Sequence, residues 1–255
     1  NDTFIFHAMV SGLIDTGEFR FTPHLADVEA LNEAAFSSSF QVTKLSFHAY
    51  LLLEERYGLL RSGAALGHGC GPLLVARDGS VDLENAVVAI PGRYTTAWML
   101  LRLWMPRIAV PVVDRFDRIM AGVSDGKYDA GLIIHEGRFV YPRYGLIRIV
   151  DLGEWWETET AMPIPLGCIA LDRKSRFYGD RERIADVIRR SVEYARAHPE
   201  ESRPYVKSHA LEMDDGVIDE HIGLYVNRYT IDLGSAGMEA VDTLREKARC
   251  AGIIP

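Results

Sequence analysis

The stretch Asp129-Ala130-Gly131-Leu132-Ile133-Ile134-His135-Glu136 is an apolar run that ends at a histidine followed by a carboxylate. A short apolar run bounded by polar residues is typical of a strand that is buried on both faces of an α/β sheet. In sheets of this kind, ligands bind just beyond the carboxyl ends of the strands. We therefore predict that His135 lies where a side chain can contact substrate.

Similar runs alternate with helical patterns over the first two thirds of the chain, which is typical of an α/β fold with mostly parallel sheets. We predict strands at residues 41–45, 73–76, 86–90, 110–113, 130–134, 147–150 and 167–171. Apolar residues with helical spacing predict helices near residues 28–35, 98–105 and 116–123. After Asp172 the pattern is helical, with breaks at His198-Pro199 and Gly252.

The composition excludes several functional classes. The chain has 255 residues, of which 48% are hydrophobic, so it can bury a substantial core. Its formal net charge of -8 argues against nucleic acid or anionic lipid as a partner. Three separated cysteines without CxxC spacing indicate free thiols in a reducing compartment. No apolar run reaches the roughly 20 residues that cross a bilayer, and we expect a cytoplasmic protein with no membrane partner.

Residues 43–46 form the first of three polar junctions between a predicted strand and a predicted helix. Ser46 can cap a helix that begins near Phe47 and leave backbone N–H groups to bind a carboxylate. Lys44 adds a positive charge there. The sequence leaves two interpretations open for Lys44, a ligand contact or a solvated side chain.

The second junction is Pro91-Gly92-Arg93-Tyr94-Thr95-Thr96-Ala97. The glycine allows a tight turn, and the two threonine hydroxyls stand at the helix start, where the helix dipole favours an anion. A helix cap needs only one hydroxyl. The pair therefore favours ligand contact over capping alone.

The third junction begins at His135. An unperturbed imidazole titrates near pH ~6.5, so His135 can be neutral at physiological pH and accept a proton as a general base. The alternative is a histidine that is satisfied by hydrogen bonds at the end of a strand. Glu136 and Arg138 either orient the imidazole or pair with each other. No histidine spacing matches a metal motif such as HExxH, so we predict no metal.

Two further segments are ambiguous. Residues 67–71, Gly-His-Gly-Cys-Gly, precede a strand instead of opening a helix, which favours a turn or hinge over a dinucleotide-binding loop. Asp27, Glu29 and Asn32 either line a cleft or form a solvated helix face.

Seven ordered segments carry a resemblance that covers most of the chain. They are Asn1-Asp2-Thr3-Phe4, Asp27-Val28-Glu29, Thr43-Lys44-Leu45-Ser46, Pro91-Gly92-Arg93 with Thr95-Thr96-Ala97, Gly131-Leu132-Ile133-Ile134-His135-Glu136, Tyr141-Pro142-Arg143-Tyr144-Gly145, and Asp151-Leu152-Gly153 with Trp155-Trp156. On these segments the chain resembles the 1,4-dihydroxy-6-naphthoate synthase family of the futalosine pathway to menaquinone.

The resemblance implies a type II periplasmic-binding-protein fold, in which two α/β lobes close over a ligand in the cleft between them. Residues 1–77 and 167–255 would form the larger lobe, and residues 78–166 the smaller lobe. It also implies a carbon–carbon lyase that converts cyclic dehypoxanthine futalosine, a small-molecule carboxylate, to 1,4-dihydroxy-6-naphthoate without a metal or redox cofactor.

The resemblance also assigns roles to residues. The proton acceptor is His135. The substrate contacts are Lys44, Leu45, Ser46, Thr96 and Ala97. We expect no partner beyond the small-molecule substrate and allow for a homodimer.

Two rival interpretations keep the same fold. One is a solute-binding protein without a catalytic step, because fold does not determine function. The other is an enzyme like chorismate dehydratase, which eliminates water from a smaller dicarboxylate. Family members usually carry a further strand ending in Ser-Pro-Cys-Pro directly before the segment that begins at Asn1, so we expect this sequence to be trimmed.

Overall fold

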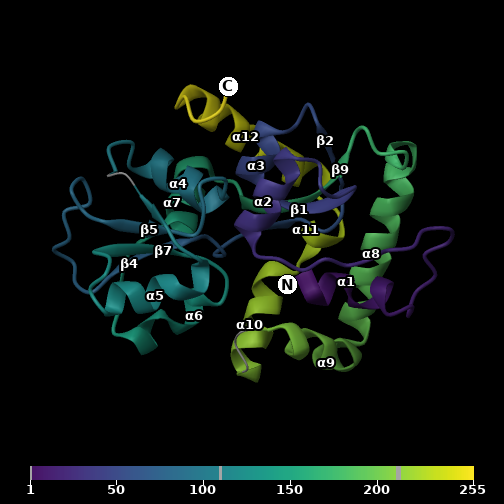
Figure 1. Ribbon diagram of the computed structural model, residues 1–255, viewed down its shortest axis with the longest axis horizontal. Helices are drawn as coiled ribbons and strands as arrows, with labels where there is room; N and C mark the ends of the chain where they lie inside the picture. The colour runs from purple at the N-terminus through teal and green to yellow at the C-terminus, as the bar shows by residue number, and fades with distance from the viewer. Residues whose placement is uncertain (1, 109–110, 211–213) are drawn as a thin grey trace.

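Two β-sheets, each with its own helices, organise the chain (Figure 1). The computed structural model describes residues 2–108, 111–210 and 214–255. The first sheet has the order β1 (Val42–Ser46), β9 (Ile164–Asp172) and β2 (Tyr57–Leu59), and β3 (Ala65–Gly67) also pairs with β9. The second sheet has the order β6 (Val112–Val113), β5 (Val88–Ile90), β7 (Ala130–Ile133), β4 (Leu73–Ala76) and β8 (Ile147–Asp151).

The prediction of mostly parallel sheets was wrong. Strands β1, β2 and β3 each pair antiparallel with β9, and β4 pairs antiparallel with both β7 and β8. In the described residues, parallel pairing occurs where β5 meets β6 and β7. The chain leaves the first sheet to build the second, and it returns in β9 against the direction of the strands already there. An apolar run shows that a strand is buried but does not show its direction.

Helices cover both faces of the second sheet. Figure 1 shows α4 (Thr96–Trp104) and α7 (Leu152–Thr160) on one side, with α5 (Phe116–Ser124) and α6 (Gly137–Val140) on the other. The helix α4 begins where Thr95 accepts a hydrogen bond from the Trp98 N–H, at 3.2 Å. Its buried face, with Met99 and Leu100 fully enclosed, packs in the hydrophobic core that continues into the first sheet.

The first sheet is covered by helices from both ends of the chain. The remaining elements are α1 (Asp2–Val10), α2 (Val28–Phe36), α3 (Phe47–Leu52), α8 (Arg181–Ala197), α9 (Pro199–His209), α10 (Asp215–Tyr225), α11 (Arg228–Ile231) and α12 (Gly234–Cys250), with 3-10 turns at η1 (Tyr141–Tyr144) and η2 (Tyr178–Asp180). Helix α1 packs on α8, where Ile5 and Met9 join Ile188 and Val192 in one apolar cluster. Helix α10 reaches the second sheet, because its Val217 belongs to the same apolar cluster as Ile133 of β7.

Most predicted elements are present with shifted ends. The predicted strand 73–76 matches β4. Of the predicted strand 110–113, β6 contains Val112 and Val113, Pro111 precedes the strand, and Val110 lies outside the described residues. The helical carboxyl third is confirmed by α8 to α12. Helix α8 ends before His198. Gly252, which follows α12, has the left-handed conformation, with φ of +65°. The prediction missed β2 and β3, which have three residues each.

The division into two lobes stays a prediction. Strand β4 lies before the predicted boundary at residue 77, yet it pairs in the second sheet. Residues 67–71 connect β3 of the first sheet to β4 of the second, as a hinge-type connection would. Within the described ranges, none of the helices combines the length and hydropathy needed to span a bilayer.

Candidate active site

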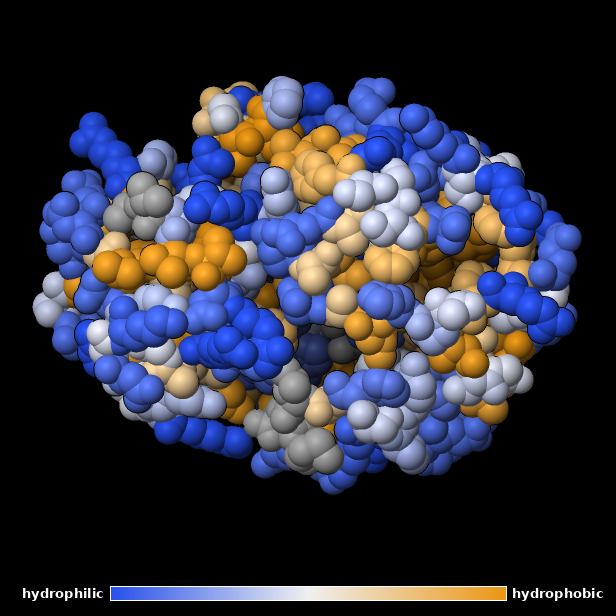
Figure 2. All heavy atoms as spheres, viewed as in Figure 1, coloured by the Kyte–Doolittle hydropathy of each residue, from blue (hydrophilic) through white to orange (hydrophobic). Residues whose placement is uncertain are grey.

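A cavity of about 1000 Å³ lies between the two halves of the molecule, and Figure 2 shows this face hollowed near its centre. Every side chain that we predicted to contact substrate or act as the base lines this cavity: Lys44, Leu45, Ser46, Thr96, Ala97 and His135. Apolar side chains also line the cavity, among them Phe6 of α1, Phe21 and Ile188 of α8.

The sheet topology explains why these distant segments meet. Strands β5 and β7 are parallel neighbours, so the junctions that follow them, residues 91–97 and His135, open at the same sheet edge. Strand β1 brings Ser46 to the opposite wall from the first sheet. Two hydrogen bonds fix the walls together. The Thr96 hydroxyl donates to the Leu166 carbonyl at 2.7 Å, and the His48 N–H donates to the Thr96 hydroxyl at 3.2 Å.

His135 has a left-handed backbone, with φ of +55°. This conformation is uncommon for a residue with a side chain, and such residues concentrate at functional sites. The Phe116 ring packs against the imidazole edge to face, with centroids 5.3 Å apart and planes at 73°. Burial lowers the pKa of His135 below its ordinary value, although the Glu136 carboxylate opposes that shift. The imidazole is therefore neutral at physiological pH, as a general base must be.

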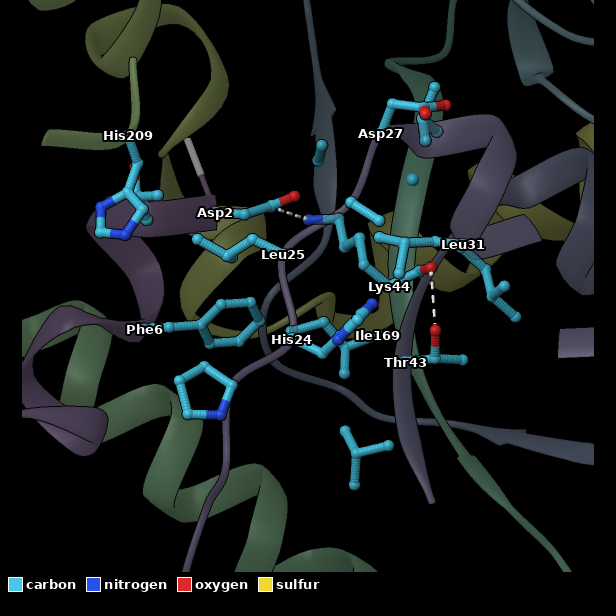
Figure 3. A pocket seen from close by; sticks show the side chains of 18 of the residues that line it. Asp2, Phe6, His24, Leu25, Asp27, Leu31, Thr43, Lys44, Ile169 and His209 are labelled. Atoms are coloured by element: carbon cyan, nitrogen blue, oxygen red, sulfur yellow. Dashed lines mark hydrogen bonds and ion pairs between the residues drawn. The ribbon is translucent and has the colours of Figure 1, made fainter. Parts of the chain in front are cut away.

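Lys44 is held by a carboxylate that the sequence analysis did not single out. Its ammonium group donates to Asp2 at 2.7 Å and to the Gly63 carbonyl at 3.1 Å, and Figure 3 shows Asp2 and Lys44 pointing toward one another. Burial favours a higher pKa for Asp2, but the charge of Lys44, its hydrogen bond and other nearby positive charge together outweigh burial, and the pKa is lowered. With a side chain that is 11% exposed, Lys44 is a partly buried, paired cation and not a solvated one.

Ser46 stands at the start of α3, but its side chain makes no capping hydrogen bond. Instead, the Asn32 amide donates to the Ser46 hydroxyl at 3.1 Å, and the Ser46 N–H donates to the Asn32 side-chain oxygen at 2.9 Å. A serine hydroxyl that accepts one bond still has its own proton to donate. Ser46 is thus fixed in position with a donor left for a ligand in the cavity.

Glu29 and Asn32 belong to a buried network and not to a solvated helix face. The Glu29 carboxylate accepts from the Tyr94 N–H, with its two oxygens at 3.0 and 3.2 Å, and from the Asn32 amide at 3.2 Å. Gly92 makes room for it, because a Cβ there would lie 2.2 Å from the Glu29 carboxyl carbon. Burial raises the pKa of Glu29. This network ties α2 to the 91–97 junction, and Asp27 caps the same helix.

Both threonines of the 91–97 junction have partners within the protein. Thr95 caps α4, and the Thr96 hydroxyl is bound to Leu166 and His48. Their hydroxyls therefore explain the helix start and the link between the halves. What the junction offers a ligand is the backbone N–H groups of Thr96 and Ala97 at the start of α4, since the first N–H groups of a helix have no partner within it and Thr95 already accepts from Trp98.

Sequence reasoning missed the contribution of α10. This helix brings His221 and Tyr225, one turn apart, to the cavity wall near His135. The signal was present in the helical spacing of residues 217–225, but a histidine on the apolar face of a helix is usually a core residue. The structure shows instead that its ring centroid lies 6.1 Å from that of His135.

One group of side chains in the described part of the chain could hold a metal ion. His198, Glu200 and Glu201 offer three ligand atoms within 4.8 Å of one another. None of them lines the cavity, and the two glutamates are exposed. The group is therefore separate from the candidate active site.

His48 makes the stability of the fold depend on pH. Burial lowers the pKa of His48 to about 4, while its Nδ1 lies 3.3 Å from the Thr95 carbonyl. The unfolded chain, with a histidine pKa near ~6.5, therefore binds this proton more strongly than the folded protein. We expect the free energy of unfolding to fall as the pH drops from ~6.5 to ~4, by about 3 kcal/mol from this group.

The measurement is urea unfolding at pH 7 and pH 4 for the wild type and for His48→Gln. The difference between the two pH values should be smaller in the variant by about 3 kcal/mol. An equal pH difference in both proteins would contradict the prediction.

Two α/β halves around a ligand-sized cavity are the architecture of periplasmic-binding-protein-like proteins. The fold is shared with an ABC transporter protein from Parabacteroides distasonis, with a TM-score of 0.63 at 14% identity over 100% of this chain and 95% of that one. It is shared with the alkanesulfonate-binding protein SsuA from Xanthomonas axonopodis pv. citri, with a TM-score of 0.62 at 14% identity over 88% and 80% of the chains. The predicted fold class is confirmed.

Within that class, the chain belongs to the menaquinone biosynthesis family, whose model matches residues 1–250. It is 48% identical over 253 residues to a Thermus thermophilus protein named 1,4-dihydroxy-6-naphtoate synthase, covering 99% of this chain and 92% of that one. A Streptomyces coelicolor protein of the same name is 44% identical over 261 residues, covering 100% and 92%. A crystal structure from Archaeoglobus fulgidus superposes with a TM-score of 0.93 at 37% identity, covering 99% and 94%.

Proposed function

We propose that this protein is a carbon–carbon lyase that converts cyclic dehypoxanthine futalosine to 1,4-dihydroxy-6-naphthoate, with His135 as the general base. The names of its relatives support the product. The observation that carries the mechanism is the position of His135, a neutral imidazole on a left-handed junction that lines the cavity between the halves.

The proposed site residues come from both walls of the cavity. Thr96 and His135 stand on the side of the second sheet, and Lys44 and Ser46 on the side of the first. The substrate carboxylate would accept hydrogen bonds from the Ser46 hydroxyl and from the N–H groups of the first turn of α4, Thr96 and Ala97 among them. Lys44 and Asp2 together add a fixed ion pair beside this position.

Closure of the two lobes would complete the site. The predicted smaller lobe, residues 78–166, would bring His135 toward Ser46 and exclude water while the base removes a carbon-bound proton. Apolar side chains of the cavity, such as Phe116 and Leu166, would contact the carbon skeleton. A cytoplasmic location and a homodimer stay predictions alongside this function.

The experiment is incubation of the purified protein with cyclic dehypoxanthine futalosine, followed by mass detection of 1,4-dihydroxy-6-naphthoate. We expect product from the wild type and none without protein. A folded protein that is stabilised by the compound but forms no product would favour a solute-binding protein. Loss of water from chorismate in a parallel incubation would favour the dehydratase instead.

A further inference from the structure

His221 is a partly buried histidine with one ring nitrogen, Nε2, that no group of the described protein binds. Its Nε2 is shielded from solvent, and among residues 2–108, 111–210 and 214–255 it has no hydrogen-bond partner. A buried donor or acceptor without a partner lowers the stability of the folded protein by about 1–3 kcal/mol. Such a group in a native protein therefore calls for an explanation, such as a ligand contact. His221 lines the same cavity as His135.

The surroundings of His221 place its ring beside that of the base. It comes from α10, whereas His135 comes from the loop after β7. The two ring centroids are 6.1 Å apart with planes at 59°, so one small group of a ligand can contact both imidazoles. On its other side, His221 packs against the Tyr225 ring at 4.6 Å, which fixes its orientation on the helix.

The electrostatics keep this second imidazole uncharged. Burial lowers the pKa of His221 well below its ordinary value, and a positive charge on His135 lowers it further. Among the described residues, the other charged and titratable groups near the two rings include Asp2 on α1, Lys44 on β1, Glu136 beside the base and Tyr225 on α10. A neutral imidazole carries one N–H, and it can donate that hydrogen bond without becoming an acid that protonates the base.

We propose that the Nε2–H of His221 donates a hydrogen bond to the substrate oxygen on which negative charge develops when His135 removes a carbon-bound proton. This inference rests on the proposed function. The named product carries two ring hydroxyls, and such a hydroxyl arises from a ring carbonyl when an adjacent carbon loses its proton.

The step balances without a further reactant. The C–H bond breaks, and its proton goes to the His135 imidazole. The electron pair of the broken C–H bond forms a carbon–carbon double bond, and the π electron pair of the carbonyl moves to the carbonyl oxygen. The N–H of His221 stabilises that oxygen and keeps its own proton, in the way that fixed donors stabilise oxyanions in a site closed to water.

The kinetic test compares two substitutions. His221→Leu removes the donor at similar volume, and His221→Gln keeps an N–H donor at a similar reach. We expect kcat for His221→Leu to fall about 10²- to 10³-fold with KM nearly unchanged, as for removal of one oxyanion donor. His221→Gln should recover most of this loss. The matched control is His198→Gln, because His198 lies outside the cavity and its side chain is 46% exposed.

The pH profile distinguishes a neutral donor from a second group that titrates during turnover. Because His221 stays neutral, the acid limb of kcat in His221→Gln should keep the wild-type midpoint. A kcat for His221→Leu within threefold of wild type would overturn the proposal. Equal losses in His221→Leu and His221→Gln, with both variants folded by thermal melting, would overturn it too.

A binding experiment separates this inference from the proposed function. If the wild type forms no product, the function is wrong, and titration of ¹⁵N-histidine-labelled protein with 1,4-dihydroxy-6-naphthoate still tests the donor. A change at the His221 Nε2 resonance, assigned from its absence in His221→Gln, supports the hydrogen bond. An unchanged resonance at saturating product rules it out.

Discussion

Replacing His135 with asparagine is expected to lower kcat about 10²- to 10⁴-fold, which is the usual contribution of a positioned general base. Asparagine is the informative substitution because it tolerates the left-handed backbone that His135 adopts at φ +55°. Alanine would add backbone strain to the loss of the base. The measurement is steady-state turnover of cyclic dehypoxanthine futalosine together with thermal melting of the same preparations.

Glu136→Gln is the matched control for this experiment. The Glu136 carboxylate raises the pKa of His135, so its removal should move the acid limb of the pH–rate profile to lower pH. Because the base stays in place, kcat at pH 8 should remain within a few fold of wild type. Turnover by a folded His135→Asn protein at the wild-type rate would show that another group is the base.

Replacing Arg138 with methionine is expected to lower the free energy of unfolding by about 3–5 kcal/mol, because it leaves a buried carboxylate without its cation. Arg138 donates to the Asp151 carboxylate and to the Gly71 carbonyl, the latter at 2.8 Å. The Asp151 side chain is completely buried. Urea unfolding at pH 7 measures the loss.

Arg148→Met is the matched control for Arg138, because Arg148 lies 3.7 Å from the same carboxylate but is 44% exposed. An exposed partner of this kind contributes about 0–1 kcal/mol. Adding Asp151→Asn to Arg138→Met should restore part of the lost stability, since the unpaired charge is then gone. Equal losses in the two arginine variants would contradict the assignment of Arg138 as the main partner.

The sequence alone predicted those parts of the site that depend on neighbouring residues. The apolar run of β7 ends one residue before His135, and the structure brings that junction beside residues 91–97, as parallel neighbouring strands require. The helix starts at residues 28 and 96 were also readable from nearby residues. These features depend on fewer than ten consecutive residues, which is the range over which propensity and capping act.

The contacts that hold the site could not be predicted, because their partners are distant along the chain. Asp2 meets Lys44 from another element, and Glu29 accepts hydrogen bonds from the backbone of Tyr94, 65 residues later. Ser46 has the residue type and position of a helix cap, yet Asn32 takes up its hydroxyl and its N–H. Strand direction was wrong for the same reason, since the order of pairing depends on where β9 returns.

The position of β9 has a consequence for folding during synthesis on the ribosome. Every strand of the second sheet lies between residues 73 and 151, whereas β1, β2 and β3 must wait for residues 164–172 before they find their pairing partner. The middle of the chain can therefore fold while its flanks are still unpaired. Until β9 emerges, the nascent protein exposes open strand edges, which are the surfaces that chaperones shield from aggregation.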